Sequence, residues 1–321
     1  MIFLKATPAA VKKAAASIRK GGTVVFPTET VYGLGADALN PLAVARIFEI
    51  KKRPEFDPLI VHVASIRQAK ALAFVTPKAE ALMKKFWPGP LTLVLPKKKK
   101  VPDLVTAGLD TVALRMPADP VALALIKRAR TPVAAPSANR FGRLSPTTAA
   151  HAKKQLKNGP DVILDGGKTR IGVESAVLLL KGRRASLLRH GGLTLEEIEK
   201  ATGPLAAGPD GGKKPRSPGR LAGHYSPSAK LVLLGKRKFR FKKGLRYGYL
   251  AFTKKPALKI KCAAVLSPSG SLQEAAAGLF SHLHRLDEAG VDVILAEPVP
   301  QRGLGRAIMD RLKRAAGKPL K

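Results

Sequence analysis

The sequence predicts an α/β protein with two domains: a first domain with a mixed sheet and a smaller second domain with a Rossmann-like pattern. Strand-like apolar segments alternate with segments of helical periodicity, although the alternation is not strict. The chain has 321 residues, a length more typical of two domains than of one. At residue 203 the composition changes to a stretch dense in glycine, proline, serine and cations that continues to residue 228. We therefore predict a first domain over residues 1–203, a Gly/Pro-rich linker over 204–229 and a second domain over 230–321.

The elements follow from local patterns, taken in chain order. A helix over residues 7–22 has Thr7 as its N-cap, Pro8 in its first turn and two glycines as its stop, and a buried strand (TVVFP) follows. Residues 32–35 (YGLG) are expected to form a tight turn. The other elements predicted in the first domain are helices at 41–51, 78–86, 120–130 and 195–200, and strands at 58–63, 91–96, 111–117, 132–137, 161–167 and 175–180. In the second domain we predict strands at 230–235, 247–252, 262–269 and 291–299, and helices at 271–289 and 305–316.

The charge balance restricts the partners. Lys and Arg number 58 against 22 Asp and Glu, a formal net charge of +36. Such a chain attracts nucleic acid, nucleotides or phosphate, although a lysine-rich solvated surface explains the excess equally well. The one cysteine, Cys262, excludes an internal disulfide framework and a cysteine-based metal cluster. The first 20 residues lack the apolar core of a signal peptide, and no stretch approaches the roughly 20 apolar residues of a membrane span, so we expect a cytoplasmic protein.

Polar residues beside apolar strands are the first candidates for chemistry. Thr28, Glu29 and Thr30 follow a buried strand, and ligands of open α/β sheets lie outside the carboxyl ends of strands. A helix-capping threonine explains this segment equally well. Lys51 and Arg53 end a predicted helix, where cations either satisfy the terminal carbonyls or clamp a triphosphate.

A second group of candidates lies further along the chain. Arg115 lies inside the apolar strand TVALRMP and must find an anion, either a substrate carboxylate or a structural aspartate. His62, in PLIVHV, fits an ordinary strand residue better than a ligand. The segment PVAAPSANRFGRLSP offers Ser137, Asn139 and Ser145 where a strand leads into a loop. No nucleophile elbow, P-loop or G-x-G-x-x-G motif is present, so phosphates would be held by scattered Lys, Arg and Ser side chains.

Taken together, these segments resemble the threonylcarbamoyl-AMP synthase family, with its YrdC-like domain, in the longer two-domain form. The matching stretches, in family order, are KGGTVVFPTETVYGLGADA, KKRPEFDPLIVHV, FWPGPLTLVLP, AGLDTVALRMP, PVAAPSANRFGRLSPT, DVILDGG, GVESAVLLL, SPGRLAGHYSP and RGLGRAIMDRLKRAAG. The resemblance implies a twisted mixed-sheet domain around a basic cavity. It also implies that L-threonine, bicarbonate and ATP react, with Mg²⁺, to threonylcarbamoyl-AMP and pyrophosphate. A separate transferase complex then modifies the adenosine beside the tRNA anticodon.

The resemblance assigns individual positions to the two substrates. The residues assigned to threonine are Thr28, His62, Arg115, Ser137 and Ser175. The residues assigned to the nucleotide are Lys51, Arg53, Thr111, Asn139, Ser145, Arg189 and Tyr225. Arg115 would pair with the substrate carboxylate, and Lys51 and Arg53 would be the catalytic cations on the phosphates. No metal-ligating residues are predicted, because Mg²⁺ would arrive with ATP.

Three features depart from the family pattern, and two other functions compete with synthesis. Asp57 stands where Asn is common, and it would either weaken the binding of an anionic ligand or pair with Arg53. The linker SPGRLAGHYSP lacks the usual Met and cation before His-Tyr, and His190-Gly191 replaces Pro-Gly.

The first rival function is that of an RNA-binding or ribosome-maturation module without synthase activity. The net charge favours it, and the lack of RNA-recognition aromatics opposes it. The second is a carbamoyl-transferring maturation enzyme, but such chains are longer and carry cysteine-rich segments that this sequence lacks.

Overall fold

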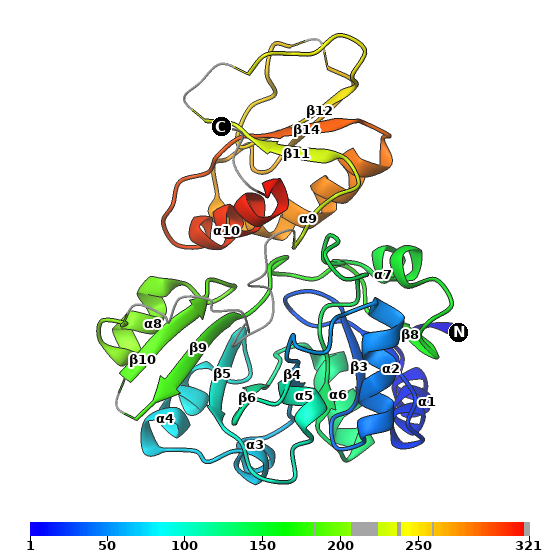
Figure 1. Cartoon of the computed structure of the whole chain (residues 1–321), viewed down its shortest axis with the longest axis vertical. Helices are drawn as coiled ribbons and strands as arrows, with labels where there is room; N and C mark the ends of the chain where they lie inside the picture. Colours follow the sequence, from blue (N-terminus) through cyan, green and yellow to red (C-terminus); the bar gives the residue numbers. More distant parts are fainter. Residues whose placement is uncertain (183, 207–223, 236–238, 259, 318–321) are drawn as a thin grey trace.

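Two stacked α/β domains make up the computed structural model of the protein (Figure 1). The structure describes residues 1–182, 184–206, 224–235, 239–258 and 260–317. Most of the predicted linker, residues 207–223, lies outside the described residues.

The first domain is built on a mixed sheet. Its described strands are β1 (Ile2–Lys5), β2 (Val24–Phe26), β3 (Gly33–Asp37), β4 (Ile60–His62), β5 (Leu91–Pro96), β6 (Thr111–Arg115), β7 (Val133–Ala134), β8 (Val162–Asp165), β9 (Ala176–Lys181) and β10 (Arg184–Arg189). Their order in the sheet is β1-β8-β2-β3-β7-β4-β6-β5-β9-β10. Parallel pairs such as β4–β6 and β5–β9 lie beside antiparallel pairs such as β2–β3 and β5–β6. The irregular alternation of elements in the sequence therefore corresponds to a mixed sheet, as predicted.

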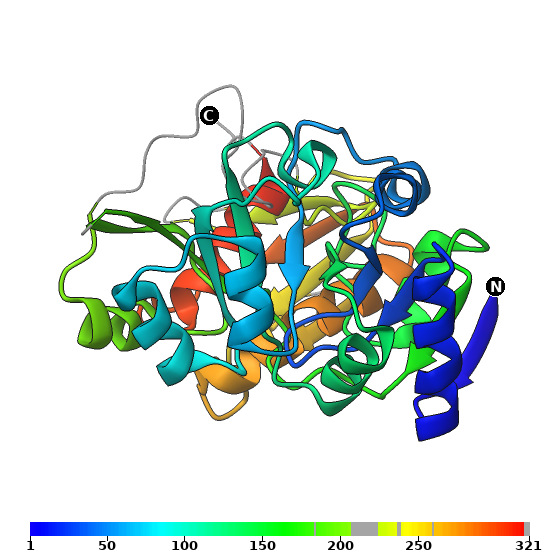
Figure 2. The same cartoon turned by 90° about the horizontal axis from the view of Figure 1, so that it is seen from below.

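Helices cover both faces of this sheet. They are α1 (Pro8–Arg19), α2 (Pro41–Lys51), α3 (Ile66–Leu72), α4 (Pro77–Phe86), α5 (Asp103–Thr106), α6 (Pro120–Ala129), α7 (Ala149–Leu156) and α8 (Leu195–Thr202). Helices α1 and α6 pack on one face, while α2 and α7 share a buried cluster with the other (Figure 2). Most of these helices start after a Ser, Thr, Asn or Asp whose side chain accepts a hydrogen bond from the first turn. These caps are local signals, which is why the starts of α1, α2, α4 and α6 can be found in the sequence.

The prediction of a tight turn at residues 32–35 is wrong. Strand β3 begins at Gly33 and runs antiparallel to β2. A Cβ atom at Gly35 would lie 2.7 Å from the ring of Phe26 and 2.6 Å from Cγ1 of Val133. The glycine therefore serves close packing on the sheet rather than a turn. The elements β1, β10, α3, α5 and α7 were not predicted either; β1 and β10, for example, are edge strands that pair with β8 and β9.

The second domain is a two-layer unit rather than a three-layer one. Its strands are β11 (Lys230–Leu233), β12 (Tyr247–Ala251), β13 (Cys262–Val265) and β14 (Val293–Ala296), and its helices are α9 (Leu272–Glu288) and α10 (Gly305–Ala316). The sheet is parallel, as the Rossmann-like pattern predicts, but its order is β11-β14-β12-β13 instead of the Rossmann order. Both helices pack on the sheet face that looks toward the first domain (Figure 1).

The two domains share buried surface. Val31, Leu144 and Val173 of the first domain belong to the same buried cluster as the apolar residues of α9 and α10. Apolar burial is the main favourable contribution to such packing. The second domain is therefore packed against the loops that carry the functional residues. None of the described helices combines the length and apolar character needed to cross a bilayer.

Candidate active site

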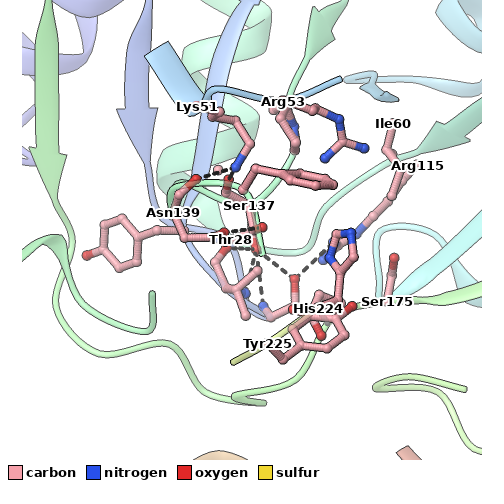
Figure 3. A pocket seen from close by; sticks show the side chains of 18 of the residues that line it. Thr28, Lys51, Arg53, Ile60, Arg115, Ser137, Asn139, Ser175, His224 and Tyr225 are labelled. Atoms are coloured by element: carbon pink, nitrogen blue, oxygen red, sulfur yellow. Dashed lines mark hydrogen bonds between the residues drawn. The ribbon is translucent and has the colours of Figure 1, made fainter. Parts of the chain in front are cut away.

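A pocket of about 670 Å³, partly open to solvent, gathers most of the candidate residues (Figure 3). Its polar lining residues are Thr28, Thr30, Tyr32, Lys51, Arg53, His62, Arg115, Ser137, Asn139, Glu174, Ser175, Arg189, His224 and Tyr225. They come from several strands and loops of the first domain and from residues 224 and 225, at the described end of the predicted linker.

The pocket lies across a face of the sheet rather than at one edge. Ile60 and His62, two residues apart on β4, both line it, so they project from the same face. Arg115 is the register partner of His62 on β6 and lies beside it. His62 and Arg115 are also the last residues of their parallel strands, and Thr28 follows β2, so the pocket extends from this face to the carboxyl ends of strands, where a ligand was expected beside Thr28.

The loop after β2 is held together by its own hydroxyl groups. Thr28 Oγ1 donates to the carbonyl of Val31 at 2.6 Å and lies 2.8 Å from Thr30 Oγ1. Thr30 Oγ1 in turn accepts a hydrogen bond from Arg115 Nη1 at 2.9 Å. Thr28 is thus both a structural residue of the loop and a lining residue of the pocket.

Arg115 has a structural carboxylate as its partner. Its Nη2 atom lies 2.8 Å from Oε1 of Glu29, and both side chains are 4% exposed. Removing one member of a buried ion pair leaves an uncompensated charge, typically at a cost of about 3–5 kcal/mol. The pair therefore holds Arg115 in place while its side chain also lines the pocket.

His62 is a neutral side chain in this setting. Burial, with the nearby Arg115 charge as the second cause, lowers the pKa of His62 to about 3. A neutral imidazole both accepts and donates hydrogen bonds, which suits contact with hydroxyl and amine groups.

Lys51 reaches from the end of α2 into the loop after β7. It is 1% exposed, and its ammonium group donates to the carbonyls of Ser137, at 2.6 Å, and Asn139. Burial, reinforced by the charge of Arg53, holds the pKa of Lys51 well below its usual value. Lys51 therefore positions the 137–139 loop instead of capping its own helix.

Arg53 is paired with the residue that departs from the family pattern. Its Nη2 lies 2.8 Å from Oδ2 of Asp57, and it donates to the carbonyls of Asp57 and Pro58. Asp57 is fully buried, and its Oδ2 lies 3.9 Å from Nε2 of His224. Of the two consequences expected for Asp57, pairing with Arg53 is the one observed.

Ser175 and Arg189 form a unit at another wall. Arg189 donates from Nε and Nη2 to the carbonyl of Ser175, at 3.2 and 3.0 Å, and from Nη2 to its hydroxyl at 3.3 Å. The Ser175 hydroxyl also lies 2.7 Å from that of Thr92 on β5. The arrangement turns part of the guanidinium toward the backbone, while both residues line the pocket.

The described end of the predicted linker returns to the pocket. The ring of His224 packs in a T-shaped arrangement against that of Phe141, with 4.8 Å between the ring centroids. Burial lowers the pKa of His224 to about 3. Tyr225 is 4% exposed and adopts a left-handed backbone conformation with φ of 66°. Its ring lies 5.7 Å from Phe280 of α9. The segment therefore connects the pocket with the second domain.

Two predicted residues do not line the pocket. Ser145 is fully buried behind it and donates a hydrogen bond to Glu174, which does line it. Thr111 begins β6, four residues before Arg115, so it lies about 13 Å along the strand from that position. The structure brings the other ten predicted residues together.

Several lining residues were not singled out from the sequence. Glu174 directly precedes Ser175 in the quoted GVES segment, and His224 directly precedes Tyr225 in the quoted linker. Their polarity and their place next to a candidate residue in a quoted segment were the available signals. The contact of Phe141 with His224 gave no signal, because it joins positions 83 residues apart.

Comparisons with known proteins agree with this geometry. Residues 16–191 match the family described as "Telomere recombination", and residues 193–317 match "Threonylcarbamoyl-AMP synthase, C-terminal domain". Threonylcarbamoyl-AMP synthase of Pyrococcus abyssi is 46% identical over 320 residues, which cover 96% of this chain and 94% of the relative. The chain belongs to the threonylcarbamoyl-AMP synthase family.

Further similarities within the synthase family extend over both domains. The Bacillus subtilis threonylcarbamoyl-AMP synthase is 46% identical over 96% of this chain and 93% of its own length. The crystal structure of P. abyssi Sua5 in complex with L-threonine superposes with a TM-score of 0.91 and 43% identity, covering 98% of this chain and 97% of that one. The two-domain form expected from the resemblance is therefore confirmed.

Proposed function

We propose that this protein joins L-threonine, bicarbonate and ATP into threonylcarbamoyl-AMP and pyrophosphate. The observation that carries the proposal is a single pocket that combines a hydroxyl-rich wall with four cationic side chains, in a chain of the synthase family. The similar Sua5 structure from P. abyssi contains L-threonine, which supports threonine as a substrate.

Threonine is assigned to the wall formed by β4, β6 and the loop after β2. Arg115 attracts the substrate carboxylate while Glu29 fixes the orientation of the guanidinium. Neutral His62 and the hydroxyl groups of Thr28, Ser137 and Ser175 suit the amine and the hydroxyl of threonine.

The nucleotide is assigned to the wall with Lys51, Arg53 and Arg189. Cations held in place before the reaction stabilise charge that develops on transferring phosphoryl groups. Asn139 and Tyr225 line the same region and would contact the nucleotide. The resemblance supports this assignment, and the buried, fixed positions of the cations suit it.

Magnesium is expected to enter with ATP. The buried carboxylates of Glu29, Asp57 and Glu174 each pair with an arginine. Among the described residues, no group of three His, Cys, Asp or Glu side chains is placed to hold a metal ion. Mg²⁺ is commonly bound through substrate phosphates and water, and it neutralises phosphoryl charge there. The residues present therefore fit a metal carried by the triphosphate rather than one with its own protein site.

Two bond-forming steps make the product. The threonine amine bonds to the bicarbonate carbon, a proton passes to the departing hydroxyl and water leaves, which gives a carbamate. A carbamate oxygen then bonds to the α-phosphorus, the bond to the bridging oxygen breaks and pyrophosphate leaves. Positioning and electrostatic stabilisation supply most of the acceleration in such transfers. His224 and Tyr225, by lining the pocket, help to exclude water that would hydrolyse the mixed anhydride.

The product is an activated acyl group and requires an acceptor. We propose that a separate transferase passes the threonylcarbamoyl group to an adenosine of tRNA. Direct contact of this chain with tRNA or other RNA stays a prediction based on its net charge of +36.

Pyrophosphate release tests the function. The purified protein is given ATP, Mg²⁺, bicarbonate and L-threonine, and each substrate is omitted in turn. We expect release only when threonine and bicarbonate are both present. Arg115→Met should abolish it, whereas Arg46→Met, which removes a half-exposed partner of Asp161 outside the pocket, should not. If pyrophosphate release stays at background in every mixture while the protein binds RNA in a salt-dependent way, the RNA-binding function would be favoured over synthesis.

A further inference from the structure

A buried arginine of the second domain reaches into the wall of the pocket. Arg311 lies on α10, is 1% exposed and is the largest of the fully buried side chains. Its Nε donates to Oε2 of Glu174 at 2.9 Å, and its Nη1 donates to the carbonyl of His190 at 2.7 Å. Both partners belong to the first domain, more than 120 positions earlier in the chain. Figure 1 shows α10 on the side of the second domain that faces the first.

Glu174 is the one carboxylate among the described residues that line the pocket. One of its oxygens binds Arg311 and the other accepts a hydrogen bond from Ser145. Burial alone would raise the pKa of Glu174, but the charges of Arg311 and Arg189 more than offset this and leave the pKa below its usual value. Glu174 is therefore an anion in the wall assigned to an anionic substrate.

The same guanidinium also supports the described end of the linker. Its central carbon lies 5.3 Å from the ring centroid of Tyr225, which lines the pocket. A cation over an aromatic face is attracted to the ring, more strongly when both are shielded from water. Arg311 thus touches two elements of the pocket wall while it stays outside the pocket itself.

We propose that Arg311 is a positioning residue for the nucleotide: it binds Glu174, so that this carboxylate neither repels the triphosphate nor competes for Arg189. The inference rests on the proposed function and assigns a role to the second domain in the same reaction. Besides Arg311, the cation whose charge acts on Glu174 is Arg189, and its guanidinium is assigned to the nucleotide. A carboxylate in that position opposes a phosphate at short range in a medium of low dielectric constant.

The proposal predicts a selective effect on ATP. Arg311→Met should raise the KM for ATP about tenfold or more, because an unpaired carboxylate then faces the phosphates. The KM for threonine should change less than about twofold, because the Glu29–Arg115 pair is untouched. Combining Arg311→Met with Glu174→Gln should return the KM for ATP to within about threefold of wild type, because the carboxylate charge is gone.

Arg306→Met is the matched control. Arg306 lies on the same helix and also pairs across the domain boundary, with Glu196, but this pair is partly exposed and outside the pocket. Its loss should leave both KM values unchanged. If Arg306→Met raises the KM for ATP as much as Arg311→Met does, the second domain acts only by docking and the proposal is overturned.

Steady-state pyrophosphate release and urea unfolding are measured on the full-length chain for each variant. Equal rises in the two KM values, or a double variant no better than Arg311→Met, would overturn the proposal. If Arg311→Met does not fold, two other variants test the proposal. The double variant Arg311→Met/Glu174→Gln should keep a KM for ATP near that of the wild type, and a tenfold rise in this folded variant would overturn the proposal. Arg311→Lys, which keeps a positive charge beside Glu174, should raise the KM for ATP less than tenfold, and a rise of tenfold or more would also overturn it. The activity of the wild type tests the synthase function separately, so a failure of that function is distinguishable from a failure of the role proposed for Arg311.

Discussion

Acidification should destabilise this protein partly through His62. Its pKa is lowered to about 3 in the folded state by burial and by Arg115, against about 6.5 in an unfolded chain. The unfolded state therefore binds the proton more tightly, and the stability contributed by the neutral imidazole is lost as the pH falls below about 6.5. Between that pH and 5 the difference is about 1.5 pH units, or about 2 kcal/mol from this one side chain. His62 is 4% exposed, so solvent screens its charge only weakly.

The assay is urea unfolding of the wild type and His62→Gln at pH 7 and pH 5. The loss of unfolding free energy between the two pH values should be smaller in His62→Gln by about 2 kcal/mol, whatever its stability at pH 7. The control is His282→Gln, at a half-buried position on α9, for which a smaller change in pH dependence is expected. Equal losses in the wild type and His62→Gln would refute the assignment of a buried neutral imidazole.

Three further substitutions test the pocket and its support. Lys51→Met should lower kcat/KM for pyrophosphate release by about 100-fold or more, since it removes a fixed cation and two hydrogen bonds to the 137–139 loop. Asp57→Asn should lower the KM for ATP, because it removes the negative charge that neutralises Arg53 but keeps the side-chain volume; an unchanged or higher KM would count against a phosphate contact of Arg53. Gly191→Ala should prevent stable folding, detected by thermal unfolding, because its Cβ would lie 2.1 Å from the carbonyl carbon of Ser175.

Three buried arginine–carboxylate pairs surround the pocket: Arg53–Asp57, Arg115–Glu29 and Arg311–Glu174. In each pair the orientation of the charged groups is fixed before a substrate binds, at the cost of desolvating both charges. The high net charge of the chain is therefore a poor guide to the charge of the pocket, where carboxylates balance several of the cations.

Much of the architecture was predictable from the sequence. The starts of α1, α2, α4 and α6 follow from capping residues and prolines in their first turns, which act within one turn of the chain. The apolar runs of β5, β6 and β9 predict buried strands. Ten of the twelve candidate residues line one pocket, because the family motifs that carry them come from segments that the sheet brings together.

Only the tertiary structure decided what each charged residue contacts. The sequence left Arg115 with either a substrate or an aspartate as its partner, and the structure pairs it with Glu29. Neither Arg311 nor Glu174 was singled out, since their ion pair spans 137 positions and the boundary between two domains. Secondary structure and caps depend on neighbours within a few residues, so the sequence by itself determines them. Buried charges instead depend on partners that arrive only when distant segments pack, because a charge removed from water must find its counter-charge wherever the fold places one.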